Sequence, residues 1–560
     1  MKTICMHHSP VTPLKGRPGC GLQPASIGIV AASSFLLLAG APAADWPQWG
    51  GSDTRNMASG EKDLPESFDP GKKKAGGSEV DLSTTRDVRW VAKLGTETYG
   101  NPTVSGGRVF VGTNNGAPRD PRLQGDRGIV MCFEEATGRF LWQLAVAKVR
   151  PEGNFNGDFK GLGVCSSPTV DGDRVYVVTS RCEVLSLDAG GQADGNDGPF
   201  LDEGRYMAPQ SIRKPGKPPS GRKPDEADKA PDPVEVTAAD GDIIWRYDLM
   251  TEIDVWPQDA TDCSVLIHGD LAYVCTSNGV DTSHTNIPSP QAPSLIALDK
   301  GTGKLVAADD AGIGPRILHG QWSSPSSAEV GGRTLIFFGA GDGYCYAFDA
   351  EPSPASGSGP GVLKTVWRCD CNPPEYRARD GKPLPYNKRG EGPSEVIGTP
   401  VFHEGRVYVT IGQDTRHGPG KGALTCIDAR LTGDISSTGR LWTYTGLNRS
   451  FATPSVSEGL VFVTDFPGKV HCLDAATGRC LWVHETGAFM MGSTFVADGR
   501  VYSGNEGGEL TILAAAKKLE VLARVDLKAP IHCTPIAANG VLYVACHRQL
   551  YAVRKTPDPR

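Results

Sequence analysis

Hydrophobic and polar residues alternate along most of the chain in runs of strand length, and these runs come in pairs. Eight such pairs span residues 100–113, 166–179, 263–276, 323–339, 398–411, 452–465, 492–505 and 533–546. A tight glycine-containing turn, such as Gly172-Asp173 or Asn539-Gly540, separates the two runs of a pair. Period-two alternation around a short turn of this kind predicts a β-hairpin. We therefore expect eight hairpins.

A third and a fourth run follow the hairpins. The third run often ends in an acidic residue, as in the segments SLD, ALD, AFD, CID and CLD, and the fourth usually carries a tryptophan: Trp142, Trp245, Trp367, Trp442 and Trp482. The shortest repeats, from Pro454 to Thr494 and from Thr494 to Pro535, are 40 and 41 residues long. Four strands in about 40–45 residues is the period of one β-propeller blade. The pattern thus predicts an all-β protein built from four-stranded antiparallel blades.

The two ends of the repeat region predict how the ring closes. The eighth unit ends near residue 554 after three strands, whereas residues 87–94, which include Trp90, have the pattern of a fourth strand. Closure removes exposed sheet edges, so we predict an eight-bladed ring in which residues 87–94 pair with the last blade; the alternative is a free N-terminal arm. Eight strands converging on one axis require small residues there, and each innermost strand opens with one: Gly100, Ser166, Cys263, Ser323, Gly398, Ala452, Gly492 and Cys533. The six tryptophans of the fourth strands are expected to dock between the wider outer blade edges.

A short motif joins the third and fourth runs. The pattern D-x-x-T-G-x-x-x-W occurs at residues 474–482 and, with Glu in place of Asp, at residues 134–142. It resembles the tryptophan-docking repeat of the quinoprotein-like propellers, a superfamily that includes dehydrogenases using pyrroloquinoline quinone (PQQ) and the BamB-like proteins of outer-membrane assembly. The likeness spans roughly residues 80–554. It implies the propeller fold, whereas a fold alone does not imply a function.

For the enzymes of that superfamily, the resemblance implies PQQ with Ca²⁺ as cofactors. Such a site needs cations for three carboxylates, oxygen ligands for Ca²⁺, and a carboxylate base near the alcohol. The chain has neither the adjacent cysteine pair of the family's alcohol dehydrogenases nor a C-x-x-C-H motif for an attached haem. Trp322 stands directly before an innermost strand, where it either stacks below a quinone or plugs the channel. We favour the plug.

The N-terminus has the features of an export signal. Lys15 and Arg17 precede the apolar run Ile27–Leu38 and small residues at 39–44, a pattern typical of a cleavable signal peptide; the alternative is a tail with a chance apolar run. No cysteine follows for a lipid anchor, and no later segment is apolar enough to cross a bilayer. The domain boundaries that follow are a signal peptide at 1–44, an N-terminal extension at 45–86, the propeller at 87–554 with a disordered Pro/Lys/Asp-rich insertion at 190–234, and a tail at 555–560. We expect a periplasmic or secreted monomer.

Charge and cysteine content narrow the function classes. The formal net charge is −7, so the chain lacks the overall basic charge typical of nucleic-acid binding. Thirteen cysteines remain after the predicted signal, and the repeat places Cys132, Cys426 and Cys472 at small core positions, which free cysteine fills well. Cys369-x-Cys371 is interpreted as an ordinary pair of neighbours rather than a redox or metal site.

Loop lengths indicate which rim of the ring binds a ligand. The first-to-second turns are tight, while the opposite rim carries long connections at 114–127, 145–163, 250–261, 278–293, 309–321, 372–396 and 412–422. Long loops on a rigid scaffold are where binding residues concentrate. The candidate cofactor-binding residues are Trp322, Asn278, Asp281, His319, Asp414 and Asp465; the candidate metal ligands are His284, His319 and His417; and the candidate catalytic bases are Asp262 and Asp342. Because no spacing such as H-x-x-x-H is present, solvated loop residues are the simpler interpretation of the histidines.

Two functions from different classes follow. The leading hypothesis is a non-catalytic binding or scaffolding module that holds a protein or envelope ligand on the long-loop rim. The alternative is a PQQ/Ca²⁺-dependent dehydrogenase of alcohols or sugars that passes electrons to a separate acceptor. A metal-dependent hydrolase on the same rim has no motif to support it.

Overall fold

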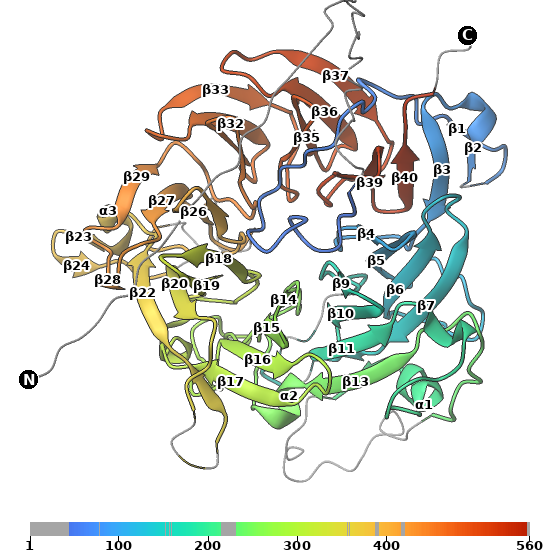
Figure 1. Ribbon diagram of the computed structural model, residues 1–560, viewed down its shortest axis with the longest axis horizontal. Coiled ribbons are helices and arrows are strands. Elements are labelled where there is room, and N and C mark those ends of the chain that lie inside the picture. The colour runs from blue at the N-terminus through green and yellow to red at the C-terminus, as the bar shows by residue number, and fades with distance from the viewer. Residues whose placement is uncertain are drawn as a thin grey trace, which may run out of the picture. The chain divides into compact units, whose positions relative to one another are not determined.

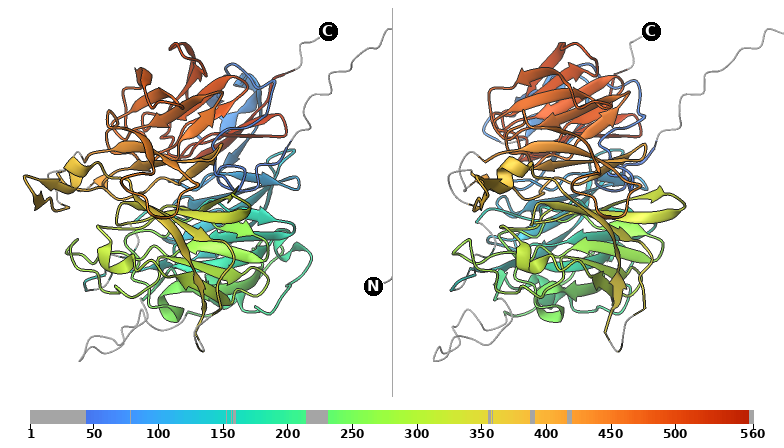
Figure 2. Two further views of the ribbon diagram at one scale, coloured as in Figure 1. Left: turned by 60° about the vertical axis from the view of Figure 1, so that its left-hand side comes forward. Right: turned by 90° about the vertical axis from the view of Figure 1, so that its left-hand side faces the viewer.

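A computed structural model describes residues 44–77, 79–151, 153–155, 157, 160–213, 231–354, 357, 359–386, 391–415 and 420–556. Nearly all of the predicted signal peptide, residues 1–43, lies outside the described residues. In the described part, eight predominantly antiparallel sheets form a ring (Figure 1), which Figure 2 shows from two further directions. The predicted eight-bladed all-β propeller is confirmed.

The blades are numbered 1 to 8 in chain order, and the strands of each run from the innermost outward. Blade 1 contains β4 (Thr103–Ser105), β5 (Arg108–Asn114), β6 (Gly128–Glu134) and β7 (Phe140–Val146). Blade 2 contains β9 (Thr169–Asp171), β10 (Arg174–Val178), β11 (Glu183–Asp188) and β13 (Ile243–Asp248). Blade 3 contains β14 (Leu266–His268), β15 (Leu271–Cys275), β16 (Leu295–Asp299) and β17 (Leu305–Asp309). Blade 4 contains β18 (Ser326–Val330), β19 (Arg333–Gly339), β20 (Tyr344–Asp349) and β22 (Thr365–Asp370).

The second half of the ring repeats this order. Blade 5 contains β25 (Val401–His403), β26 (Arg406–Ile411), β27 (Ala423–Asp428) and β29 (Arg440–Tyr444). Blade 6 contains β30 (Ser455–Ser457), β31 (Leu460–Thr464), β32 (Lys469–Asp474) and β33 (Cys480–Glu485). Blade 7 contains β34 (Phe495–Ala497), β35 (Arg500–Gly504), β36 (Glu509–Ala514) and β37 (Val521–Asp526). Blade 8 contains β38 (Ile536–Ala538), β39 (Val541–Ala545), β40 (Gln549–Val553) and, from the start of the chain, β3 (Val88–Lys93).

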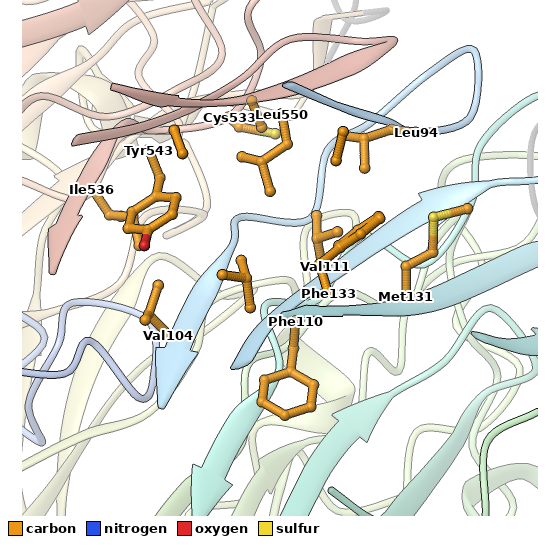
Figure 3. Packing of buried hydrophobic residues seen from close by; sticks show 14 of the residues in the cluster. Leu94, Val104, Phe110, Val111, Met131, Phe133, Cys533, Ile536, Tyr543 and Leu550 are labelled. Atoms are coloured by element: carbon orange, nitrogen blue, oxygen red, sulfur yellow. The ribbon is translucent and has the colours of Figure 1, made fainter. Parts of the chain in front are cut away.

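The ring closes as predicted. Strand β3 pairs antiparallel with β40, with Trp90 opposite Ala552 and Lys93 opposite Gln549. Figure 3 shows the seam between the last and first blades, where Tyr543 and Ile536 of blade 8 face Val104 of blade 1. These side chains belong to one continuous hydrophobic cluster and are fully or almost fully buried. The two ends of the propeller are therefore joined by a packed core as well as by hydrogen bonds.

Two blades have one strand more than predicted. Strand β21 (Gly361–Leu363) adds parallel to β17 of blade 3, and β28 (Gly433–Asp434) adds parallel to β22 of blade 4. Both come from the connection between the third and fourth strands of the following blade. A short extra strand protects an outer edge that would otherwise be open.

Each of the six outer tryptophans docks its own blade onto the next one. The indole N–H of Trp142 donates to Ala189 O at 3.0 Å, and Trp90, Trp245, Trp367, Trp442 and Trp482 make the same bond to Glu135, Lys300, Ala429, Ala475 and Ala516. The motif glycine makes room for the ring: Gly478 has φ +71°, and a Cβ there would lie 2.5 Å from Trp442 Cδ2. The T-G motif is thus a docking surface for the preceding blade.

Changing Trp142 to Phe tests this bond. The phenyl ring fills most of the space, but Ala189 O loses its buried donor, so we expect the free energy of unfolding to fall by about 1–3 kcal/mol. Urea denaturation measures the loss. Leu441→Ala, at a position on β29 that is 46% exposed, is the control and should stay within about 0.5 kcal/mol of the parent. Equal losses in the two variants would contradict the docking role.

The prediction of disorder for residues 190–234 is wrong for the part that the structure describes. Residues 190–213 form η2 (Gly191–Ala193), α1 (Glu203–Met207) and β12 (Ser211–Ile212), which pairs in parallel with β8 (Lys148–Val149). Arg127 donates to the carbonyls of Met207 and Pro209. The segment therefore runs along blade 1 towards the long-loop rim. The Pro/Lys-rich stretch that motivated the prediction is at 214–230, outside the described residues.

The remaining elements are short and lie in the N-terminal region or the long connections. They are β1 (Lys72–Lys73), β2 (Val80–Asp81), η1 (Leu82–Thr84), α2 (Leu249–Glu252), η4 (Gly314–Arg316), α3 (Pro374–Arg377), β23 (Ala378–Arg379) and β24 (Lys382–Pro383). All thirteen cysteines in the described part of the chain carry free thiols, and eleven of them are buried.

Residues 44–69, which we call the plug segment, cross one end of the central channel. Figure 1 shows this dark-blue stretch running across the middle of the ring before it reaches β3. Its hydrogen bonds reach all eight blades: Trp46 N–H to Val104 O, Val170 N–H to Pro47 O, Arg55 to Val265 O, Ser327 N–H to Asp53 O, Phe402 N–H to Thr54 O, Asn56 to Val456 O, Val496 N–H to Met57 O, and Asn539 N–H to Glu61. These partners lie on the innermost strands, at their tight turns or, for Val265, directly before an innermost strand. The plug segment therefore closes the rim opposite the long loops.

Arg55 fastens the plug segment from inside. Its side chain is fully buried, and its guanidinium donates to Trp49 O at 2.7 Å, to Val265 O at 2.8 Å and to Pro325 O at 3.0 Å. Burial lowers its pKa to about 10, so the group stays charged at neutral pH. One side chain thereby ties the plug segment to blades 3 and 4.

Candidate functional site

A cavity of about 350 Å³, which we call the funnel, lies in the centre of the ring with Trp49 of the plug segment among its lining residues. Its walls come from the residues that lead into the innermost strands of all eight blades. The plug segment closes the tight-turn rim, so the funnel opens at the long-loop rim. Its volume falls in the range of small-molecule pockets.

The sequence repeat dictates which side chains face the funnel. In every blade the residue before the small strand-opening residue and the residue after it both line the cavity, because positions two apart in extended chain point the same way. The first set, the wall ring, is Tyr99, Cys165, Asp262, Trp322, Ile397, Phe451, Met491 and His532. The second set, the polar girdle, is Asn101, Ser167, Ser264, Ser324, Thr399, Thr453, Ser493 and Thr534.

The polar girdle locks the blades together. A backbone N–H of one girdle residue donates to the side-chain oxygen of the next, as from Ser264 to Ser324 at 2.9 Å and from Thr453 to Ser493 at 2.8 Å. Six of the eight steps around the ring are made in this way. Trp49 Nε1 joins the girdle by donating to Thr399 Oγ1 at 3.1 Å. The girdle explains why small hydroxyl residues recur at this position of the repeat.

Carboxylates dominate the charge of the funnel. Asp262 belongs to the wall ring, while Asp259 and Asp414 come from long-rim loops. Asp262 Oδ1 is buried and has no hydrogen-bond partner among the described residues. Burial raises the pKa of Asp262 to about 8. The indole N–H of Trp322 donates to Gln258 O and Ala260 O, both at 3.1 Å, which fixes the loop that carries Asp259.

The candidate residues predicted from sequence have different surroundings in the structure. Asp262, Trp322 and Asp414 meet in the funnel. Trp322 forms part of the wall and leaves the cavity open, so the expectation that it plugs the channel is wrong; the plug segment does so. Because residues 45–86 precede the repeat, no pattern in the sequence places them inside the ring.

Other candidates have structural partners instead. Asp342 accepts from Tyr346 Oη at 2.6 Å and pairs with Arg316 at 3.2 Å, and Asp465 accepts from Asn448 at 2.9 Å. Both are buried but do not line the funnel. Their carboxylates hold loops in place, so the funnel gives no support to the catalytic role for Asp342 or the cofactor contact for Asp465, and both stay predictions.

Four further candidates lie in loops of blades 3 and 4. The side chain of Asn278 accepts a hydrogen bond from Trp256 N–H and donates one to Ser289 O. The carboxylate of Asp281 accepts hydrogen bonds from Ser283 and Asn286. His284 Nδ1 lies 2.9 Å from His319 Nε2, and the two rings are stacked. None of the four lines the funnel, and His417 lies outside the described residues. Loop-internal bonds therefore account for the two polar residues.

A buried acid that sequence reasoning missed lies beside the funnel. Glu395 is fully buried, and its Oε1 accepts from Tyr386 Oη at 3.0 Å and from Asp414 N–H at 3.1 Å. Burial, with the nearby Asp414, raises the pKa of Glu395 to about 8. It thereby positions the backbone of Asp414 at the lip of the funnel.

An apolar ridge leads outward from the funnel. Phe451 of the wall ring packs on Phe466 at 5.4 Å between centroids, and Phe466 stacks on Phe489 at 4.9 Å. Phe489 is 52% exposed and Met491 is 36% exposed. These four residues, which we call the aromatic ridge, come from the long-rim connections of blades 6 and 7.

The signal for the wall ring is present in the sequence. Trp322 is a candidate because it stands directly before an innermost strand, and the same rule applied to every blade finds Asp262, Tyr99, Phe451 and His532. Asp259 and Trp49 lie in stretches without periodicity, where no rule of this kind applies.

Comparison with known proteins decides the family. A family model described as outer membrane protein assembly factor BamB matches residues 77–196, 364–491, 420–522 and 468–555, together more than half of the chain. The chain belongs to this family of PQQ-like β-propellers. The resemblance predicted from the docking motif is thereby confirmed.

Several solved structures match the chain at low identity. This PQQ-like propeller is similar to BamB from Moraxella catarrhalis, at 13% identity and a TM-score of 0.48, over 84% of this chain and 98% of that one. It is similar to quinohemoprotein alcohol dehydrogenase from Comamonas testosteroni, at 16% identity and a TM-score of 0.44, over 93% and 82%. The computationally designed Ika8 protein matches at 10% identity and a TM-score of 0.45, over 82% and 99%. No curated protein matches the chain significantly.

The funnel of this PQQ-like propeller does not fit the cofactor after which the family is named. PQQ carries three carboxylates, which need cationic partners, yet the described residues that line the funnel include no Lys or Arg and three Asp. In the described part of the chain, no group of three or more His, Cys, Asp or Glu side chains could hold a metal ion. Arg55 is held by carbonyls and is not among the lining residues. We derive no catalytic step through PQQ.

None of the helices in the described residues is long and apolar enough to span a membrane.

Proposed function

We propose that this PQQ-like propeller is exported and binds a segment of another envelope protein on its long-loop rim, without catalysing a reaction. The observation that carries the proposal is the aromatic ridge. Phe489 and Met491 expose apolar surface beside the open end of the funnel, and exposed apolar patches next to a cavity are typical of protein interaction sites. Aromatic and methionine side chains are enriched in such interfaces.

Membership of this family also supports a role in protein binding. The matching family model describes an outer membrane protein assembly factor, and an assembly factor works through contacts with other proteins. The tightly bonded ring provides a rigid support for the long loops. The dehydrogenase alternative lacks support from the funnel, where the described lining residues are acidic or neutral rather than cationic.

Site-specific photo-crosslinking in the native host tests the proposal. A benzophenone amino acid at position 489 is expected to give a defined crosslinked band to an envelope protein, because that side chain lies on the ridge. The same substitution at Leu201, which is 70% exposed in the insertion of blade 2, is the matched control and should give no such band. Equal crosslinking from both positions, or none from position 489, would contradict the proposal.

Cofactor titration separates the two function classes. The purified protein is mixed with PQQ and Ca²⁺ at micromolar concentrations, and dye-linked oxidation of alcohols and sugars is measured. We expect neither stoichiometric uptake nor turnover. Uptake of one PQQ per chain with turnover would replace the binding module with the enzyme.

A further inference from the structure

The funnel has the chemistry of a site for a positively charged group. We propose that it binds a primary ammonium or guanidinium group, which enters from the long-loop rim and pairs with Asp262. The ligand is either a free organic amine or a Lys or Arg side chain of the segment that lies on the aromatic ridge. The second source rests on the proposed function, whereas the first does not.

Asp262 is the acidic member of a wall ring that has no Lys or Arg to pair with it. Its Oδ1 is buried without a hydrogen-bond partner among the described residues. A buried carboxylate oxygen left unpaired costs free energy, and a ligand that donates a hydrogen bond recovers it. An N–H donor that carries a positive charge makes a charge-assisted hydrogen bond, which is stronger than one from a neutral donor.

The aromatic side chains of the funnel favour the same ligand. Trp322, Tyr99 and Phe451 belong to the wall ring and Trp49 also lines the cavity. Aromatic faces attract ammonium and guanidinium groups through their quadrupole, most strongly where water is excluded. A cavity that combines aromatic rings with carboxylates is therefore selective for cations over anions of the same size.

A metal ion fits less well than an organic cation. Asp259, Asp262 and Asp414 line the same cavity, but no described group of three acidic, histidine or cysteine residues is arranged to hold a metal ion. An ammonium or guanidinium group needs one carboxylate and an aromatic wall rather than several converging oxygens.

Protonation of Asp262 links binding to pH. Burial raises its pKa to about 8, so the carboxyl is largely protonated at neutral pH while the funnel is empty. A bound cation favours the carboxylate and expels the proton. Affinity for a cation should therefore rise with pH and level off above about pH 8.

The neighbours of Asp262 whose pKa is shifted do not change their protonation near pH 8, so they cannot cause the same pH dependence. The pKa of His532 is lowered to about 3 and that of Tyr99 is raised, so both stay neutral. Behind Asp262, burial raises the pKa of Cys263 to about 12 and also raises that of Cys275. Cys165, Asp259 and Asp414 also line the cavity, and Arg55 donates to the carbonyl of Trp49, which lines it too.

Calorimetry with three probes of one shape tests the proposal on the purified full chain. Benzylamine is the cationic probe, benzyl alcohol the neutral one and benzoate the anionic one. We expect benzylamine to bind at least about tenfold more tightly than the other two, and we expect methylguanidine to compete with it. Benzoate binding as tightly as benzylamine would overturn the proposal.

Variants locate the binding group. Asp262→Asn should weaken benzylamine binding by at least about tenfold, while Asp270→Asn, at an exposed position on the opposite rim, should leave it unchanged. The unmodified chain gives an independent readout: affinity should rise by about tenfold per pH unit below pH 8 and one proton should be released per amine bound. A flat pH profile, or unchanged affinity in folded Asp262→Asn, would overturn the assignment.

A peptide pair identifies the source of the charge. Acetyl-Gly-Lys-Gly-amide is compared with the norleucine analogue, which has the same chain without the ammonium group. Binding of the lysine peptide with loss in Asp262→Asn supports a protein side chain as ligand, whereas binding of benzylamine alone supports a free amine. Benzylamine binding measured in the purified protein does not depend on the crosslinking result at position 489, so failure of one proposal is distinguishable from failure of the other.

Discussion

Replacing Arg55 with methionine is expected to lower the free energy of unfolding by about 3–5 kcal/mol. Methionine keeps much of the side-chain volume, but the carbonyls of Trp49, Val265 and Pro325 lose the donor that now satisfies them. Leaving buried acceptors unpaired costs about 1–3 kcal/mol each, with partial relaxation. Because Arg55 ties the plug segment to blades 3 and 4, we also expect residues 44–69 to become sensitive to protease before the ring unfolds. Urea denaturation and timed proteolysis measure the two effects.

The control for Arg55 is an arginine on the surface. Arg86→Met removes a side chain that is 66% exposed and pairs loosely with Asp87, and it should change the free energy of unfolding by less than about 0.5 kcal/mol. Arg55→Lys should fall between the two, since an ammonium group cannot present the planar fork that reaches three carbonyls. An Arg55→Met protein as stable as Arg86→Met would show that the plug segment is held by its other contacts alone.

The architecture was predictable from sequence because each of its elements repeats. Period-two alternation, the T-G turn before Trp482 and the unpaired fourth strand at Trp90 are local signals, and a closed ring is the arrangement that leaves no edge exposed. The same repeat also defines the wall ring, although only Trp322 was predicted from its place in the repeat, and Asp262 was predicted as an acid of the long-loop rim. Repetition thus carries both the fold and the position of the funnel.

The plug segment and the insertion of blade 2 were not predictable in this way. The stretch around Trp49 and Arg55 has no periodicity, and its structure depends on hydrogen bonds to eight blades whose residues are distant in sequence. Tyr206 and Met207 of the insertion are buried against blade 1, whereas the composition of the whole segment indicated disorder. In both cases tertiary contacts outweigh local composition.

Acidic residues were the least predictable part of the candidate site. Asp342 and Asp465 have the residue type that a catalytic base needs, yet ion pairing with Arg316 and hydrogen bonding from Asn448 use their carboxylates for structure. Asp262 has the same residue type and lacks such a partner at Oδ1 among the described residues. The residue type is the same in all three cases. Only the three-dimensional surroundings distinguish a carboxylate that holds a loop from one whose oxygen is left for a ligand to bond.

Stability is expected to fall as the pH rises from about 5 to about 8, and Glu395→Gln should remove part of that fall. Burial raises the pKa of Glu395 to about 8, so the folded chain keeps a proton that the unfolded chain releases near its ordinary value of 4.5. The free energy that favours the folded state is therefore fully present below about pH 4.5 and is lost as the pH approaches 8. The linkage relation gives roughly 3–4 kcal/mol between pH 5 and pH 8.

Glutamine keeps an oxygen to accept from Tyr386 and from Asp414 N–H but cannot ionise. We therefore expect the stability of Glu395→Gln, measured by urea denaturation at a series of pH values, to decline less steeply than that of the parent over this range. Glu485→Gln changes an acid that is 73% exposed and should leave the slope unaltered. Parallel slopes for the parent and Glu395→Gln would show that Glu395 is already ionised in the folded protein. Tyr386 and the backbone N–H of Asp414 would then stabilise a negative charge beside the funnel. A bound cation would be attracted by Glu395 as well as by Asp262.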